Sequence, residues 1–222
     1  MNTATSPEQT SEPEQTSERL IAFLDAAIAI ALTLLILPLM EGVSEASADG
    51  QSLAEYVDEH ASQLLAFTIS FAIIALFWRL HHVILLPDTP TGRGRTTLQF
   101  AWLFTITLMP VVTALTGGLD TDRPLVVSYV GTLAVSASLL FVIALVERRK
   151  RVAAGLPVRA TATAAPLAMA LLFTLVLLLA LIVPSYFWLF LMALAAPLRA
   201  GLLRLGVVGR ETQGTVTTDE AD

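Results

Sequence analysis

The sequence predicts an all-α polytopic membrane protein with six transmembrane helices per subunit. The composition is too apolar for a soluble domain, because 55% of the 222 residues are hydrophobic, 14% are charged and the mean hydropathy is +0.72. Apolar runs recur with the length of roughly 20 residues that a spanning helix needs. The basic residues also gather on one side of these runs. The six predicted spans lie at about 20–40, 64–86, 96–116, 125–146, 163–183 and 185–205.

The first span, 20–40, follows an acidic leader and has full spanning length, so we expect it to be a retained helix and not a signal peptide. The second span ends in a polar stretch that contains His81 and His82. The third carries Pro110 near its end, and the fourth is followed by the basic cluster 148–151. Each of these four runs can cross a bilayer once.

The last two spans come from one nearly continuous apolar stretch, Ala164 to Leu198. At about 1.5 Å per residue, a single helix of this length would exceed a hydrocarbon core of roughly 30 Å. The stretch must therefore turn. Pro184 and Ser185 interrupt it, and we predict a tight helical hairpin there.

The basic residues orient the spans. All lysines and arginines except Arg123 fall on one side of the predicted membrane. The positive-inside rule then places both termini in the cytoplasm and the chain in the cell membrane as a multi-pass protein. The loop between the first two spans is acidic, and it is either a solvated linker or an outer mouth that concentrates cations. Its acidic residues are Glu41, Glu45, Asp49, Glu55, Asp58 and Glu59.

The chain divides into a six-helix transmembrane domain, 19–206, and two polar tails, 1–18 and 207–222, that we expect to be disordered. Cysteine is absent, which excludes disulfides and thiolate sites. The net charge of −6 argues against a nucleic-acid partner. No common catalytic motif occurs, so we expect neither enzyme activity nor a cofactor. Adjacent residues on a helix point about 100° apart, so His81 and His82 do not predict a metal site.

Two ionisable residues, Arg19 and Asp25, lie at the start of the first span. A charge inside a spanning helix costs about 3 kcal/mol at mid-bilayer, so such groups usually face protein or water. Arg19 and Asp25 are about 9 Å apart along the helix axis and on different faces, so each needs another partner. The end of the second span, with Trp78, His81 and His82, reaches the depth of Asp25. We predict a polar cluster between the two helices; alternatively, Arg19 extends to lipid headgroups and Asp25 is solvated.

Arg19, Phe23 and Asp25 also carry a family resemblance. The stretch from Arg19 to Asp25, RLIAFLD, resembles the RxxxFSD signature of the transmembrane protein 175 family of potassium channels, with Leu24 where the family has serine. The stretch 77–82, FWRLHH, is similar to the FWxxHH stretch of that family. The stretch 108–113, LMPVVT, resembles the proline-containing end of its third helix.

The resemblance implies a homotetrameric, weakly to moderately selective potassium channel in which the first helices line the pore. It implies a hydrophobic constriction at Ile30, Leu34 and Leu37, with permeant K⁺ as the only ligand. The i, i+4, i+7 spacing of Ile30, Leu34 and Leu37 places these side chains on one stripe of the helix, although such apolar stripes also pack against other helices. No TVGYG-like filter occurs. Thr33 is a candidate pore-lining residue, but a threonine hydroxyl in a membrane helix usually bonds to its own backbone.

Two other classes remain open from the residues alone. A proton-coupled secondary transporter would also place Asp25 and histidines in the membrane. Such a transporter would require ionisable groups near the midplane of the bilayer, with broken helices around them. A membrane scaffold would use the apolar stripes only for packing.

Overall fold

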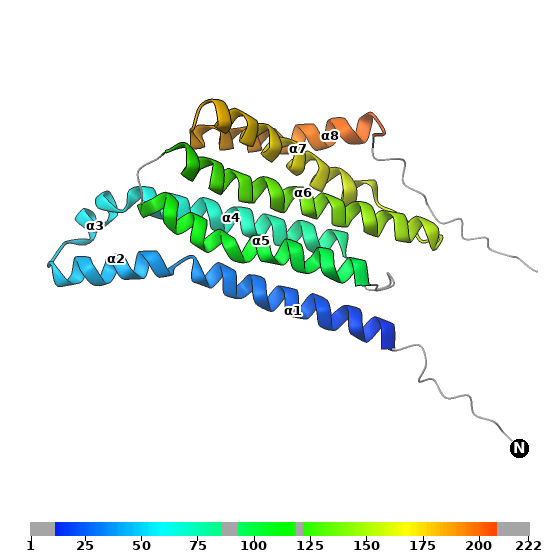
Figure 1. Ribbon diagram of the computed structural model, residues 1–222, viewed down its shortest axis with the longest axis horizontal. Coiled ribbons are helices and arrows are strands. Elements are labelled where there is room, and N and C mark those ends of the chain that lie inside the picture. The colour runs from blue at the N-terminus through cyan, green and yellow to red at the C-terminus, as the bar shows by residue number, and fades with distance from the viewer. Residues whose placement is uncertain (1–11, 86–92, 119–121, 208–222) are drawn as a thin grey trace, which may run out of the picture.

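The computed structural model describes residues 12–85, 93–118 and 122–207. The secondary-structure elements formed by these residues are helices. They run back and forth as one elongated bundle (Figure 1). Six helical segments are long and apolar enough to cross a membrane, which confirms the predicted fold class. These segments are Glu18–Ala48, Ala61–Ile84, Gly94–Gly117, Arg123–Ala153, Ala160–Ile182 and Tyr186–Arg204. Residues 1–11 and 208–222 of the predicted tails lie outside the described residues.

The first span is not one continuous helix, as the sequence led us to expect. It is divided into α1 (Glu12–Leu34) and α2 (Leu37–Ala48). The break follows from Pro38, which has no N–H to donate to the carbonyl of Leu34. Instead, the N–H of Ile36 donates to the carbonyl of Thr33 at 3.3 Å, closing a tighter turn. α1 also begins before Arg19, so residues 12–18 are helical within the segment where a disordered tail was expected.

The α2 helix is followed by the short helix α3 (Leu53–Glu59). Ser52 and Glu55 form a capping box at its start: the Glu55 carboxylate accepts from the Ser52 N–H at 2.7 Å, and the Ser52 hydroxyl accepts from the Glu55 N–H. Both hydrogen bonds lower the pKa of the Glu55 carboxyl, and the bond from the Ser52 backbone N–H has the larger effect. The acidic segment between the first two spans is therefore folded.

The core is built by α4 (Ala61–Ile84), α5 (Arg93–Gly118), α6 (Arg123–Ala153) and α7 (Ala160–Ile182). Its largest fully buried side chains are aromatic: Phe77, Trp102 and Phe173. The rings of Phe77 and Phe173 meet edge to face with centroids 5.7 Å apart, which joins α4 to α7. These four helices form the packed part of the bundle.

The chain turns after Ile182, so the predicted hairpin at Pro184 is confirmed. The returning segment differs from a single α-helix: it is a 3₁₀ helix, η2 (Tyr186–Leu194), continued by α8 (Ala195–Arg204). The Ser185 hydroxyl accepts from the Phe187 N–H at 3.2 Å and starts η2. This segment packs on α7 and leaves large side chains such as Phe190 exposed.

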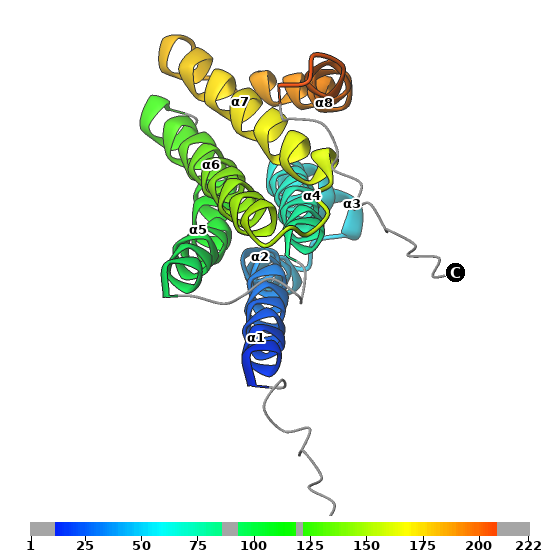
Figure 2. The same cartoon turned by 90° about the vertical axis from the view of Figure 1, so that its right-hand side faces the viewer.

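Successive spans run in opposite directions, so the start of α1, the ends of α4, α6 and α8, and the starts of α5 and α7 gather at one end of the bundle (Figure 1). Figure 2 looks onto this end, where α1 lies at the edge of the bundle, farthest from α7 and α8. The acidic segment of α2 and α3 lies at the opposite end. We call the end of the bundle at which α1 starts the Asp25 end, because α1 carries Asp25 there.

Candidate pore face and polar contacts of the first helix

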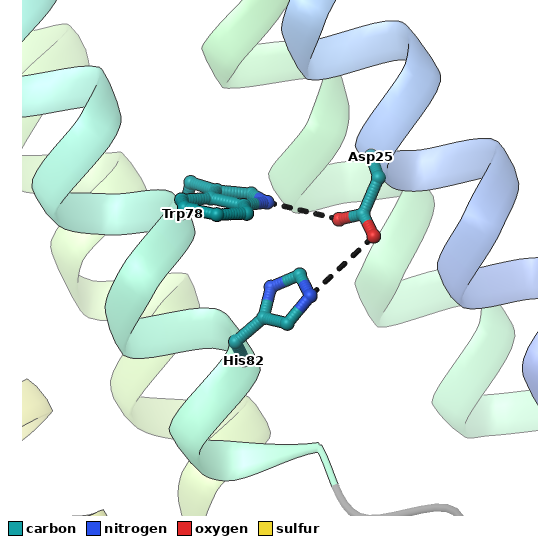
Figure 3. A network of polar contacts seen from close by, with 3 residues as sticks. All are labelled: Asp25, Trp78 and His82. Carbon is teal, nitrogen blue, oxygen red and sulfur yellow. Dashed lines mark hydrogen bonds and ion pairs between the residues drawn. The ribbon is translucent and has the colours of Figure 1, made fainter.

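Asp25 of α1 accepts polar contacts from two side chains of α4. The indole Nε1 of Trp78 donates to Asp25 Oδ1 at 3.0 Å, and His82 Nε2 lies 3.4 Å from Asp25 Oδ2 (Figure 3). Trp78 and His82 are four residues apart, so both project from one face of α4 toward α1. Their rings also pack against each other, with centroids 4.8 Å apart. The cluster joins the first helix to the rest of the subunit.

The Asp25 cluster is only partly closed to solvent. The side chain of Asp25 is 34% exposed and that of His82 is 40% exposed. A carboxylate that accepts an indole N–H and faces an imidazole gains charge-assisted hydrogen bonds when His82 is protonated. The arrangement therefore holds a negative charge near the start of α1 without an arginine partner.

The structure separates the other predicted members of the cluster from Asp25. Arg19 is exposed, and no partner is found for it among the described residues. Phe23 lies against Phe100 of α5, with ring centroids 5.7 Å apart. His81 points into the core, where its Nε2 lies 2.6 Å from Gln99 Oε1. It also stacks on Trp102 at 4.3 Å.

Leu24, which stands where the resembling family has serine, is fully buried in the core. An apolar contact therefore occupies the position where the family signature has a serine hydroxyl. The Asp25 contacts described above do not use this position.

The three predicted constriction residues lie on the uncovered side of the first span. Ile30 is 59% exposed, Leu34 42% and Leu37 51%. The break between α1 and α2 interrupts this stripe, because Ile30 and Leu34 lie in α1 and Leu37 lies in α2. The opposite side of the span packs into the core through residues that repeat at helical spacing, Leu24, Ile28, Ala31 and Leu35. One side of the first span thus packs into the core, and the other is apolar and is not covered by any other part of the chain that the structure describes.

The hydroxyl of Thr33 donates to the carbonyl of Ile30 at 2.8 Å. This is the backbone bond that threonine usually makes in a membrane helix. The Thr33 proton is therefore used within α1.

Sequence reasoning missed a buried ion pair at the Asp25 end. Arg95 Nε of α5 lies 2.8 Å from Glu147 Oε1 of α6, and the two side chains are 2% and 3% exposed. The sequence held one signal, since Glu147 is an isolated acid at the end of an apolar run. Such a residue is costly unless it is paired, which would have justified a search for a partner.

Sequence reasoning also missed a set of buried hydroxyl contacts between α4, α5 and α6. Thr113 Oγ1 donates to Ser70 Oγ at 2.8 Å, and Ser70 Oγ lies 2.9 Å from the Tyr129 hydroxyl. Ser136 Oγ donates to Thr105 Oγ1 at 2.6 Å. These bonds satisfy polar groups inside an apolar bundle and fix the neighbouring helices against one another.

Across residues 12–85, 93–118 and 122–207, no group of three or more His, Cys, Asp or Glu side chains could hold a metal ion.

Residues 19–110 match the family model described as endosomal/lysosomal potassium channel TMEM175. This stretch of the chain is therefore similar to the TMEM175 potassium channel family. The match confirms the family resemblance predicted from the residues. The TMEM175 match begins at Arg19 and ends at Pro110 in α5, so it includes Asp25, Trp78 and His82. It covers less than half of the 222 residues and leaves α6, α7, η2 and α8 outside. No curated protein and no solved structure matches the chain.

Proposed function

We propose that the chain forms a potassium-permeable channel, weakly to moderately selective for K⁺, with a hydrophobic constriction at Ile30, Leu34 and Leu37. One observation supports this proposal most strongly. The first span presents an apolar stripe that no other described helix covers, and it lies within the segment that matches the model of a potassium channel family. The permeant ion is the only ligand this function requires, and no catalytic step is part of it.

The pore is formed between subunits. α1 lies at the edge of the bundle and packs mainly on α5 and α4, so a single subunit does not enclose its stripe (Figure 2). Several copies arranged around an axis would bring their first helices together and cover this face. We propose a homotetramer, which rests on the family resemblance.

Closure of the pore follows from dewetting. A narrow ring of branched aliphatic side chains offers no replacement for the hydration shell of an ion. K⁺ is less strongly hydrated than Na⁺ and loses water at a lower cost, so a preference for K⁺ needs no coordination cage. The break at residues 35–36 divides the stripe between Leu34 and Leu37. A break of this kind is a hinge at which the constriction can widen.

Both termini lie in the cytoplasm and the Asp25 end faces the cytoplasmic leaflet of the cell membrane in this proposal. The positive-inside rule supports this orientation, because the basic cluster 148–151 ends α6 at the Asp25 end. The acidic segment of α2 and α3 then faces outward.

The proposal is tested by ion flux from proteoliposomes that hold the purified full-length chain. With a K⁺ gradient and a protonophore to clamp the proton gradient, we expect K⁺ flux that exceeds the Na⁺ flux measured in matched vesicles. Flux that appears only when a proton gradient is supplied would contradict the channel and indicate a proton-coupled secondary transporter. Protein that is folded but passes neither ion in any oligomeric preparation would also contradict it.

The pore face has its own test, because the chain lacks cysteine and any introduced thiol is unique. Ile30→Cys places a thiol on the proposed pore face, whereas Ile182→Cys places one on an exposed site of α7, which is 72% exposed. If the first helices surround the pore, a water-soluble thiol reagent reduces K⁺ flux only in Ile30→Cys. Block of neither variant, with labelling of Ile182→Cys alone, would mean that lipid covers Ile30.

A further inference from the structure

An open cleft at the Asp25 end is lined by three arginines. Residues from the ends of α4 and α6 and from the start of α7 line it. Figure 2 shows these helix ends near one another. Arg148 and Arg151 come from the last turns of α6, and Arg159 is the N-cap residue of α7. Val83 of α4 forms part of the apolar wall. Neither the polar cluster of Asp25 nor the proposed pore face includes these residues.

The cleft has a surplus of positive charge. Glu147 also lines it, but its carboxylate is buried against Arg95 at 2.8 Å, so its charge is balanced inside the core. Arg151 Nε donates to the carbonyl of Pro157 at 3.1 Å, so this side chain is already engaged. Within the described ranges, no ion pair is found for Arg148 or Arg159. The cleft is therefore suited to an anion.

Two further features of the cleft fit an anion with several oxygens. The Nε of Arg148 is buried and has no hydrogen-bond partner among the described residues, so a buried donor is left to satisfy. The α7 helix begins at the cleft, and its N-cap side chain makes no capping bond. A helix N-terminus carries partial positive charge and favours anions. Guanidinium groups bind phosphate oxygens in a planar, bidentate arrangement.

We propose that this cleft binds a phosphate group, with Arg148 and Arg159 as its main ligands. The headgroup of an anionic phospholipid and a soluble phosphate share this chemistry. The position of the cleft favours the lipid, because it lies at the ends of the membrane-crossing helices, where headgroups lie. Basic pockets between helices on the cytoplasmic side commonly bind anionic headgroups. The exposed side chain of Val83 offers an apolar surface beside the cleft for an acyl chain.

The test uses the full-length protein, purified in detergent and stripped of lipid. Its unfolding temperature is titrated with dioctanoyl phosphatidylglycerol, with dioctanoyl phosphatidylcholine and with inorganic phosphate. Arg148→Gln and Arg159→Gln each remove one proposed ligand. Arg149→Gln is the matched control, because Arg149 belongs to the same basic cluster but is exposed and does not line the cleft.

We expect dioctanoyl phosphatidylglycerol to stabilise the unmodified protein and Arg149→Gln at similar concentrations. Arg148→Gln and Arg159→Gln each remove a charge-assisted hydrogen bond, so each weakens the apparent affinity about tenfold. The same pattern with inorganic phosphate would support the phosphate site and assign it to a soluble ligand. Phosphatidylcholine should stabilise less, because its headgroup carries no net charge.

Equal weakening by Arg149→Gln would overturn the proposal, because binding would then depend on the general charge of the cluster. Stabilisation that none of the three substitutions changes would overturn it as well. If Arg159→Gln does not fold, Arg159→Lys retains the charge and loses the bidentate geometry. It should then weaken binding of phosphatidylglycerol less than Arg148→Gln does, and unchanged affinity in both variants would overturn the assignment.

Discussion

Glu147 and Asp25 lie at the same end of the bundle and are held in opposite ways. The Glu147 carboxylate pairs with Arg95 at 2.8 Å, with both side chains closed to solvent, and it joins α5 to α6 inside the core. The Asp25 carboxylate meets Trp78 and His82 at 3.0 and 3.4 Å, and about a third of its side chain is exposed.

The difference shows which helices are fixed and which can shift. Separating α5 from α6 would leave a charge unpaired in an apolar interior, which is costly. Moving α1 against α4 exchanges contacts of Asp25 that water can replace. In the proposed channel, α1 lines the pore and moves when the pore opens, and polar contacts that water can replace favour such a movement.

The largest expected effect comes from breaking the buried pair. Arg95→Ala leaves the Glu147 carboxylate buried without this partner, and we expect it to lower the free energy of unfolding by about 3–5 kcal/mol. Equilibrium unfolding in mixed micelles measures this value. The matched control is Arg149→Ala, an exposed position that should change stability by no more than about 0.5 kcal/mol. Similar losses in both variants would contradict the distinct role of the pair.

Replacing both members of the pair sharpens the result. Arg95→Met combined with Glu147→Leu removes both charges and leaves apolar side chains in the core. Replacement of a buried pair in this way is often neutral or stabilising. We expect the double variant to recover most of the stability that Arg95→Ala loses, measured in the same micelles. A double variant as unstable as the single one would mean that the cost comes from lost packing and not from a stranded charge.

Asp25→Ala should have a smaller effect. The Trp78 indole loses its acceptor, but water can reach the site, so we expect a loss of about 1 kcal/mol in the free energy of unfolding. Size-exclusion chromatography should also show weaker assembly, while the K⁺ flux per assembled channel changes less. Asp25→Asn retains an acceptor oxygen and serves as the control with the smaller loss. A loss as large as that of Arg95→Ala would show that the Asp25 contacts are closed to water in the assembled protein.

The smallest effect is expected at Thr33. Its hydroxyl already donates to the Ile30 carbonyl, so Thr33→Val removes only a local bond of α1. We expect stability to change by no more than about 0.5 kcal/mol and K⁺ flux from proteoliposomes to stay the same. A several-fold fall in flux with unchanged stability would instead place this hydroxyl in the path of the ion.

Much of the fold could be predicted from the sequence, because the lengths of apolar runs determine how often the chain crosses a bilayer. The turn at Pro184 and the contact of Asp25 with the end of α4 followed from lengths and depths alone. Lengths and depths could not predict which of His81 and His82 contacts Asp25. Adjacent residues point about 100° apart, so only the rotation of α4 decides that His82 faces Asp25 and His81 faces the core.

The buried pair could not be predicted for a related reason. Pairing of Arg95 with Glu147 depends on which faces of α5 and α6 meet, and tertiary packing sets those faces. Pro38 removes one backbone hydrogen bond beside the break after Leu34, but Pro110 and Pro166 lie inside the continuous helices α5 and α7, so a proline alone does not predict a break. The 3₁₀ conformation of Tyr186–Leu194 has no comparable local signal in the sequence.

The central claim is that Ile30 faces the pore, and paired asparagine substitutions test it most directly. Ile30→Asn and Ile182→Asn make the same chemical change at two exposed apolar positions, 59% and 72% exposed, on different helices. K⁺ and Na⁺ flux from proteoliposomes is measured for both variants and the unmodified protein. We predict that Ile30→Asn raises basal flux or reduces the preference for K⁺, because a polar side chain hydrates the constriction, whereas Ile182→Asn leaves both unchanged. Unaltered flux in a folded, assembled Ile30→Asn protein would contradict the claim.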